Sequence, residues 1–168
     1  LRLRNRYVRQ LARLDKLTGL YNRRGFVESA RHYQSEYPGR PMALALLDVD
    51  NFKFFNDRYG HEIGDKVLQH MAGSLRQILG AASILGRSGG DEFIALMPVA
   101  DGKEAEEKLK AFIHSPHELL IENRSFRYTT SLGYVMYPDQ VMDREDMYRF
   151  ADMALYATKL RGGNGVSR

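Results

Sequence analysis

The sequence predicts a mixed α/β fold of the α+β type, in which helices alternate with single strands except at one central hairpin. Three observations carry this prediction: a continuous apolar run at 42–47, a helical repeat of apolar residues over 63–79, and the glycine pair Gly89-Gly90 between two short apolar segments. A continuous apolar run is typical of a strand buried on both faces. Two adjacent glycines suit a tight turn that needs positive φ. The order α-β-α-β-β-α-β-α matches the split β-α-β arrangement of ferredoxin-like folds.

The other elements follow from apolar spacing and from breaker residues. Val8, Leu11 and Leu14 recur three residues apart among arginines and predict an amino-terminal helix over 1–14. That helix either packs on its own domain or ends a coiled-coil linker from an upstream sensor, and two heptads do not decide between them. Further helices are expected at 22–34, 104–114 and 146–160, and further strands at 83–85, 93–97 and within 126–137.

Composition limits the class of protein. The 168 residues, 43% of them hydrophobic, suffice for one globular core. The longest apolar run is far shorter than the roughly 20 residues that cross a bilayer, so no membrane span is expected within the chain. With no cysteine, disulfide scaffolds, Cys-ligated zinc and thiol nucleophiles are excluded, and the cytoplasm is the default location.

The positive charge is confined to one end of the chain. Residues 1–24 hold eight Lys or Arg and one acid, which leaves 17 basic and 20 acidic residues in the remainder. The body is therefore mildly acidic, which argues against a nucleic-acid-binding face. Because the chain begins with Leu1, we expect it to be a piece of a longer or processed protein.

Carboxylates stand where the central strand and the hairpin end. Asp48 and Asp50 close the apolar run, and Asp91 and Glu92 follow Gly89-Gly90. Ligand-binding groups gather at strand ends in open α/β sheets, so a hairpin beside the first strand would bring Asp48, Asp91 and Glu92 together. A divalent cation would neutralise such a cluster, and oxygen ligands suit magnesium or manganese. The alternative is ordinary turn chemistry, because Asp and Glu are common in turns.

The segment between these carboxylates offers groups suited to a nucleotide. Lys53 is a compact cation that a triphosphate could use, or else a solvated surface lysine. Asp65 could accept two adjacent N–H groups of guanine, with Asn56 as an amide partner. Alternatively, the helix dipole alone favours Asp65 in a first turn. His61 is expected to be structural, because no second histidine stands at metal-ligand spacing.

Six segments stand in a fixed order along the chain: Asp15-Lys16-Leu17-Thr18-Gly19-Leu20-Tyr21-Asn22-Arg23-Arg24, Asp48-Val49-Asp50-Asn51-Phe52-Lys53, Asn56-Asp57 with Gly60-His61 and Gly64-Asp65, Arg87-Ser88-Gly89-Gly90-Asp91-Glu92-Phe93, Ser131-Leu132-Gly133, and Ala154-Leu155-Tyr156-Ala157-Thr158-Lys159. Together they resemble the successive signatures of GGDEF domains, the diguanylate cyclases. The resemblance runs from about Asp15 to Asn164, which divides the chain into a linker helix at 1–14 and a GGDEF catalytic domain at 15–168.

The resemblance implies a palm-type nucleotidyl cyclase fold, with a central, mainly antiparallel sheet flanked by helices. It implies an enzyme that condenses two GTP into cyclic di-GMP and releases two pyrophosphates, with two Mg²⁺ or Mn²⁺ ions per GTP site. Each domain would hold one GTP, so the active form would be a two-fold homodimer. An upstream sensor, and in some parents a downstream output domain, would be the partners.

The resemblance also assigns roles to single residues. Asp48, Asp91 and Glu92 would be catalytic and would bind metal, assisted by the Val49 carbonyl, and Glu92 would activate the ribose 3′-hydroxyl. The residues expected to bind substrate are Asn56 and Asp65 at the guanine, Lys53 and Lys159 at the triphosphate, Asn51 and Phe52 through backbone N–H groups, and Gly89 and Gly90 in the hairpin turn.

Two positions depart from the family pattern. An inhibitory Arg-x-x-Asp pair that often precedes the hairpin is replaced by Gly80 and Ser83, so little product inhibition through that site is expected. The tail has Gly163 where the family commonly has arginine, and Arg161 is a candidate to compensate. Three interpretations follow: an active diguanylate cyclase, a catalytically weak GTP-binding module that regulates a fused phosphodiesterase or other output domain, and an interaction domain without nucleotide chemistry.

Overall fold

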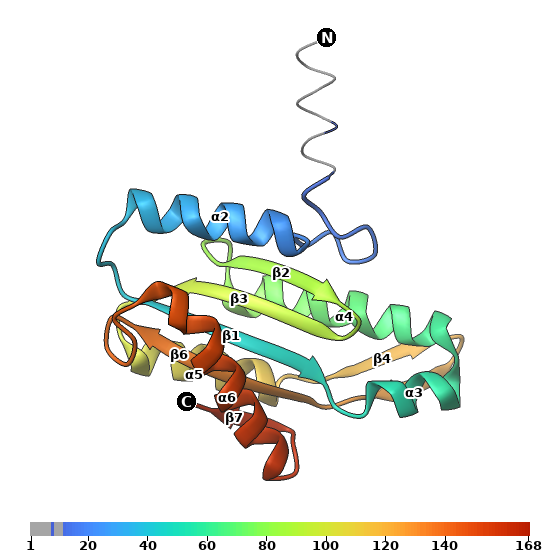
Figure 1. Ribbon diagram of the computed structural model, residues 1–168. Helices are drawn as coiled ribbons and strands as arrows, with labels where there is room; N and C mark the ends of the chain where they lie inside the picture. The colour runs from blue at the N-terminus through green and yellow to red at the C-terminus, as the bar shows by residue number, and fades with distance from the viewer. Residues whose placement is uncertain (1–7, 9–11) are drawn as a thin grey trace.

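A computed structural model describes residue 8 and residues 12–168 of the chain (Figure 1). Its helices and strands carry the labels of Figure 1. In chain order they are α2 (Arg23–Glu36), β1 (Met42–Val49), α3 (Phe52–Tyr59), α4 (His61–Leu79), β2 (Ile84–Gly89), β3 (Glu92–Pro98), α5 (Gly102–His114), β4 (Glu118–Ile121), β5 (Arg124–Arg127), β6 (Thr130–Tyr137), a 3₁₀ turn at Arg144–Asp146, α6 (Met147–Leu160) and β7 (Gly165–Ser167).

The main sheet has five strands in the order β2-β3-β1-β6-β7. All neighbours are antiparallel except β6 and β7, which run parallel. In the central part, Leu47 of β1 lies opposite Phe93 of β3 and opposite Leu132 of β6. The carboxyl end of β1 therefore lies beside the tip of the β2–β3 hairpin on one side and beside the start of β6 on the other.

Strand β1 is buried along its whole length because helices cover both faces of the sheet. Its side chains alternate: Ala43, Ala45 and Leu47 join one core, whereas Leu44 and Leu46 join the other. The first core lies under α4 and α5, and the second lies under α2 and α6. This alternation follows from the two-residue period of a strand. It explains why the sequence shows a continuous apolar run here.

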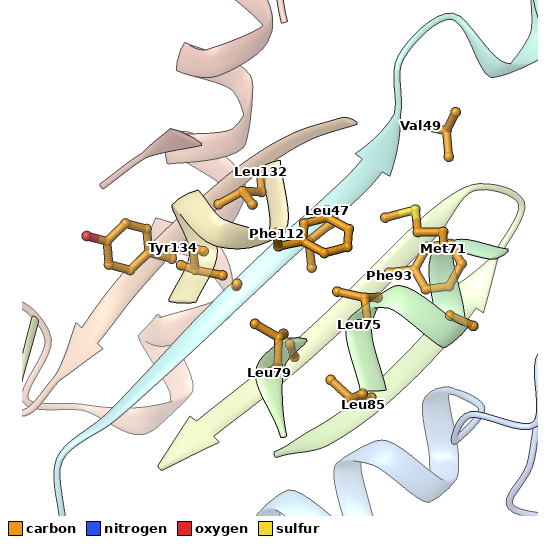
Figure 2. Close-up of a cluster of buried hydrophobic side chains, with 14 of the residues drawn as sticks. Leu47, Val49, Met71, Leu75, Leu79, Leu85, Phe93, Phe112, Leu132 and Tyr134 are labelled. Atoms are coloured by element: carbon orange, nitrogen blue, oxygen red, sulfur yellow. The ribbon is translucent and has the colours of Figure 1, made fainter. Parts of the chain in front are cut away.

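The core under α4 is the larger of the two, and Figure 2 shows its centre. Leu75 of α4 and Phe112 of α5 are fully buried against Leu47 and Phe93 of the sheet. Each such side chain contributes about 1.5–3 kcal/mol relative to an exposed one. This packing fixes the sheet and α4 relative to each other, and both carry polar residues at the same end of the molecule.

The predicted fold class is confirmed: a mainly antiparallel sheet is flanked by helices, and the expected hairpin is β2–β3. Three elements, α3, β4 and β7, were not predicted, and one expected strand is divided. Helix α3 carries aromatic residues such as the exposed Phe54, which are weak helix formers without an amphipathic period. The expected strand region 126–137 divides between β5 and β6, which belong to different sheets. Strand β7 is too short to show a period and forms by pairing with β6.

The expected helix over 1–14 lies largely outside the described residues, Leu11 included. Val8 is helical, but residues 12–14 form a turn and a bridge in which Leu14 pairs with Tyr21. The Asn22 side chain donates to the Ala12 carbonyl at 2.9 Å, and Arg13 forms an ion pair with Glu28 of α2. Residues 12–14 are thus attached to the domain. Within the described ranges, no helix has both the length and the apolarity needed to cross a bilayer.

Candidate active site

A polar cleft of about 860 Å³ opens where five elements end. Its walls come from the carboxyl end of β1, the tip of the β2–β3 hairpin, the amino-terminal ends of α3 and α4, and the segment from the last turn of α6 to the loop after it. The lining residues are Asp48, Val49, Asp50, Asn51, Phe52, Lys53, Asn56, Asp57, His61, Gly90, Asp91, Glu92, Lys159, Gly162 and Gly163. Most of the site residues expected from the sequence therefore share one cavity.

Asp48 is the most buried carboxylate of the cleft, with an exposed fraction of 6%. Burial raises the pKa of its carboxyl, and the charges of Asp91 and Asp50 add to that effect, while Lys159 opposes it. One oxygen forms an ion pair with the Lys159 ammonium group. The other, Oδ1, is buried and has no hydrogen-bond partner among the described residues. An unpartnered buried carboxylate oxygen is costly unless a ligand occupies it.

Lys159 reaches this carboxylate from α6 with half of its side chain exposed. Burial disfavours its charged form, but the carboxylates of Asp48, Asp91 and Asp50 outweigh that effect and raise the pKa of the ammonium group. Lys159 is therefore a fixed positive charge at the mouth of the cleft. Such a charge can bind an anionic ligand or partly neutralise Asp48 while the ligand is absent.

Asp91 and Glu92 stand at the hairpin tip, next to the end of β1. Burial raises the pKa of the Asp91 carboxyl and the charge of Glu92 raises it further, whereas backbone N–H groups of Asp91 and Val49 lower it. Glu92 is exposed and accepts a hydrogen bond from Ser88 Oγ at 3.3 Å. Glu92 is the first residue of β3, and Asp91 lies in the turn that precedes it.

The expected convergence of three carboxylates is not present. Within residues 12–168 and at residue 8, no three His, Asp or Glu side chains lie close enough to hold a metal ion together. Asp48 and Asp91 do interact electrostatically, and the cleft lining holds five carboxylates against two lysines. This excess of negative charge, together with the unpartnered Asp48 Oδ1, suits a divalent cation bound to Asp48, Asp91 and a backbone carbonyl.

The amino-terminal end of α3 forms the side of the cleft opposite the hairpin. Asn51 precedes the helix in a left-handed conformation, with φ of 52°, and makes no side-chain cap. Phe52 and Lys53, the first two residues of α3, line this cavity. Free N–H groups and the helix dipole favour an anion at this position, and the Lys53 side chain adds a positive charge.

Asn56 projects from α3 toward α4. Its Oδ1 is buried without a hydrogen-bond partner among the described residues. A Cβ atom on Gly64 would lie 1.8 Å from that oxygen, so the glycine is required by the position of the amide. Asp65 is the next residue on α4, but it is exposed and does not line the cleft. The structure thus places Asn56 in the lining of the cavity and Asp65 on the exposed surface of α4, outside that lining.

Asp50 has a structural role that sequence reasoning missed. Its carboxylate accepts hydrogen bonds from Thr129 Oγ1 at 2.6 Å, from Ser131 Oγ at 2.5 Å and from the Asn164 backbone N–H at 2.9 Å. It therefore joins the loop after α6 to the start of β6 and shapes the wall of the cleft. The partners are 79 to 114 residues away in sequence, which is why spacing alone could not reveal them.

Comparison with known proteins decides the family. The family described as "Diguanylate cyclase, GGDEF domain" matches residues 12–165. The chain belongs to the GGDEF family. The crystal structure of the coiled coil and GGDEF domain of DgcB from Caulobacter crescentus, in complex with c-di-GMP, is 30% identical with a TM-score of 0.85. That match covers 99% of this chain and 91% of the other.

Two curated relatives of the chain have different named activities. Diguanylate cyclase DgcP of Pseudomonas aeruginosa is 38% identical over 163 residues, covering 92% of this chain and 23% of DgcP. Cyclic di-GMP phosphodiesterase NbdA of the same organism is 32% identical over 162 residues, covering 95% of this chain and 21% of NbdA. The chain therefore spans less than a quarter of either relative.

The structure explains one departure of this GGDEF domain from the family pattern. Gly163 has φ of +73°, and a Cβ atom there would lie 3.0 Å from Asp50 Oδ1 and from Ser131 Oγ. An arginine at this position would need both a strained backbone and movement of the Asp50 network. Arg161 does not compensate, because its guanidinium donates to Ser167 Oγ and to the Val166 carbonyl of β7, and it does not line the cleft.

Some residues of this GGDEF domain were placed differently from expectation. Gly89 lies outside the cleft lining, although Gly90 is part of it. Asp57 and His61 line the cleft but were not predicted to bind anything. The sequence indicated them only through their position in the family motif that runs from Asn56 to Asp65.

Proposed function

We propose that this GGDEF domain is a diguanylate cyclase, which condenses two GTP into cyclic di-GMP and releases two pyrophosphates. The observation that carries the proposal is the cleft itself. The buried carboxylate of Asp48 and the half-buried carboxylate of Asp91 share one cavity with the amino terminus of α3 and with two lysines, Lys53 and Lys159. That arrangement matches the needs of phosphoryl transfer, which depends on positioning and on charge stabilisation rather than on a covalent protein group.

In the proposed reaction, the 3′-hydroxyl of one GTP attacks the α-phosphorus of the other. A phosphorus–oxygen bond forms to the 3′-oxygen, the bond to the bridging β-phosphate oxygen breaks, and pyrophosphate leaves. The exposed carboxylate of Glu92 is our candidate to accept the hydroxyl proton. Lys53, Lys159 and the first N–H groups of α3 would hold the triphosphate, and Asn56 would contact the guanine, with Asp65 as its predicted partner.

A divalent ion fits the carboxylates of this site. We propose that Asp48, Asp91 and the Val49 carbonyl hold Mg²⁺ or Mn²⁺. When bound, the ion would neutralise the phosphate charge and stabilise the attacking and leaving oxygens. In its absence, Lys159 supplies the charge that balances Asp48. Lys159 is then free to turn from Asp48 to a phosphate once the metal is present.

The reaction requires two copies of the domain. Each cleft would hold one GTP, and each 3′-hydroxyl must reach the α-phosphate held by the other copy. We therefore propose a two-fold dimer in which the clefts face each other, so that assembly controls the rate.

The decisive experiment is incubation of the chain with GTP and Mg²⁺, followed by chromatography of the products. We expect cyclic di-GMP and pyrophosphate from the native chain. The variant Asp91→Asn with Glu92→Gln should give no product while retaining its circular-dichroism spectrum and cooperative melting. A folded native chain that yields no cyclic di-GMP at high protein concentration would overturn the proposal.

The second candidate function is a GTP-binding module that makes little product and regulates a fused output domain. Gly163, in place of the family arginine, is the observation that favours it, together with the similarity to NbdA, which is named as a phosphodiesterase. Calorimetric titration with GTP and Mg²⁺ separates the two candidates. Binding without turnover supports the regulatory module, and binding with turnover supports the cyclase.

A further inference from the structure

The turn that carries Asp91 and Glu92 depends on Arg87 for its shape. The strand register shifts between Arg87 and Gly89, and the turn that follows contains two glycines with φ of +138° and +53°. Glycine backbones have many accessible conformations, so this turn needs an external restraint. Arg87 supplies it, because its Nε and Nη2 atoms both donate to the Gly90 carbonyl, at 2.9 and 2.7 Å.

Arg87 is itself held by the segment that enters the domain. Its Nη1 atom forms an ion pair with Asp15 Oδ1 at 3.0 Å, and the two side chains are only 13% and 18% exposed. Its backbone N–H donates to the Tyr21 carbonyl at 2.8 Å, while the Tyr21 N–H donates to Leu85. The entering segment therefore contacts Arg87 through both its backbone and its guanidinium.

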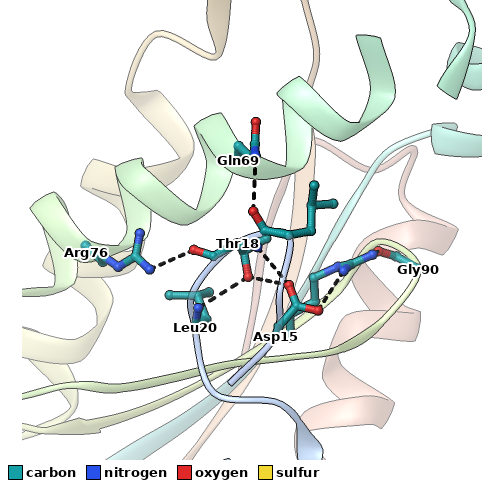
Figure 3. Close-up of polar contacts among 8 residues, drawn as sticks. Asp15, Thr18, Leu20, Gln69, Arg76 and Gly90 are labelled. Atoms are coloured by element: carbon teal, nitrogen blue, oxygen red, sulfur yellow. Dashed lines mark hydrogen bonds and ion pairs between the residues drawn. The ribbon is translucent and has the colours of Figure 1, made fainter. Parts of the chain in front are cut away.

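Asp15 is fixed within a tight turn, which Figure 3 shows beside Gly90. Its other oxygen accepts hydrogen bonds from the Thr18 N–H at 2.9 Å and from Thr18 Oγ1 at 2.7 Å. Arg76 of α4 donates to the Thr18 carbonyl at 2.7 Å, and Gln69 donates to the Leu17 carbonyl at 3.1 Å. Asp15 thus has one oxygen on the entering turn and the other on the arginine that holds the catalytic turn.

We propose that Arg87 is a positioning residue that couples the entering segment 12–21 to the turn bearing Asp91 and Glu92. Arg87 does not line the cleft, whereas Gly90, which it holds, does. Displacement of the entering segment would withdraw Asp15, loosen the guanidinium and free the Gly90 carbonyl, and the two carboxylates would lose their fixed placement. This regulatory inference rests on the proposed cyclase function, because it concerns the same site.

The test is a double-mutant cycle between Asp15→Asn and Arg87→Gln in the full chain, read by amide hydrogen exchange at 89–93. Asparagine keeps an acceptor for Thr18 but removes the charge that holds Arg87. We expect each single variant to speed exchange of the turn about tenfold, as loss of a hydrogen bond to a charged group implies, and the double variant to add little more. Arg87→Lys should behave like Arg87→Gln, since lysine cannot donate twice to one carbonyl from this position.

The matched control is Glu28→Gln, which removes the ion pair of the entering segment with α2 but leaves Asp15 and Arg87 intact. It should leave exchange at 89–93 unchanged. In the activity assay, Asp15→Asn should lower kcat about tenfold with the KM for GTP within twofold of native, because Lys53, Lys159 and Asn56, which are proposed to hold the triphosphate and the guanine, stay in place. Unchanged exchange in Asp15→Asn, or additive effects in the cycle, would overturn the coupling. Amide hydrogen exchange can be measured without catalytic turnover. A chain without cyclase activity would therefore refute the proposed function, while the exchange test of the coupling would remain valid.

Discussion

At the residue scale, the position of the Asn56 side chain depends on the absence of a Cβ atom at Gly64. Gly64 is buried on α4, and its missing Cβ leaves the space that Asn56 Oδ1 occupies. A helix interior normally disfavours glycine by about 1 kcal/mol relative to alanine. The chain accepts that cost beside a cleft-lining residue whose buried amide oxygen has no hydrogen-bond partner among the described residues, which is typical of a position kept for ligand binding.

We predict that Gly64→Ala weakens GTP binding at least tenfold, because the new methyl group would displace the Asn56 amide. The control is Gly73→Ala on the same helix, where a Cβ would meet nothing within 4 Å. That variant should bind GTP normally and melt about 2 °C higher through better helix propensity. Calorimetric titration and thermal melting measure both effects. Equal GTP affinity in the two variants would contradict the proposed role of Asn56.

A second residue-scale feature is a buried histidine cluster away from the cleft. His117 packs between the rings of Phe112 and Tyr128, each with its centroid 5.0 Å away, and His70 Nδ1 lies 2.7 Å from the Tyr128 hydroxyl. Burial lowers the pKa of His117, and a protonated His70 would lower it further. The Phe112 backbone opposes this shift, but no hydrogen bond of normal geometry to a described residue reaches either His117 ring nitrogen.

We predict that acid weakens the fold through His117. A histidine whose folded pKa is depressed stabilises the protein fully above its unfolded pKa of about 6.5, and that stability is lost as the pH falls below it. The melting temperature should therefore drop by about 3 °C between pH 7.5 and pH 5.5. His117→Phe should fill the same space and remove most of that drop, with His70 accounting for the remainder. If the melting temperature of this variant fell with pH as steeply as that of the native chain, His117 would be excluded as the cause.

At the scale of elements, α6 is joined to the sheet by one buried hydroxyl. Thr158 Oγ1 lies 2.8 Å from the Leu132 carbonyl of β6 and 2.6 Å from Ser167 Oγ of β7. Lys159, the next residue, faces Asp48. The contact therefore both anchors the carboxyl-terminal strand and sets where the lysine enters the cleft.

We predict that Thr158→Val costs about 1–3 kcal/mol, because the variant removes the buried hydrogen bonds of the hydroxyl with the Leu132 carbonyl and with Ser167 Oγ. Thr130→Val is the matched control: Thr130 is also fully buried, but its hydroxyl has no hydrogen-bond partner among the described residues. Its stability should stay within about 0.5 kcal/mol of native. Urea denaturation gives both values. Similar losses in the two variants would show that burial of the hydroxyl, rather than its contacts with β6 and β7, is what matters.

At the scale of the whole molecule, the proposed reaction requires two copies of the chain. The specific rate should rise with protein concentration until the dimer is saturated, because the second cleft is then supplied in trans. Initial rates over a hundredfold range of concentration, compared with sedimentation under the same conditions, test this. A constant specific rate where sedimentation shows only monomer would exclude the facing-cleft dimer. Whether the helix expected over 1–14 ends a coiled-coil linker stays a prediction, since most of that segment lies outside the described residues.

Local patterns in the sequence were sufficient for the strands and helices with a clear period. The apolar run of β1, the amphipathic repeat of α4 and the Gly89-Gly90 turn all form where expected, because strand and helix periods are imposed by backbone geometry and burial. The motifs also predicted most residues that line the cleft, Asp48, Asp91 and Lys159 among them.

Tertiary structure alone decided the features that depend on partners distant in sequence. Strand β7 exists because β6 offers an unpaired edge, and Asp50 is bound by groups that come from β6 and from the loop after α6. The pairing of Lys159 with Asp48 and the link from Asp15 through Arg87 to Gly90 likewise require the folded sheet. A sequence period reports which face of an element is buried, but electrostatic and hydrogen-bond partners are chosen only when separate elements meet in space.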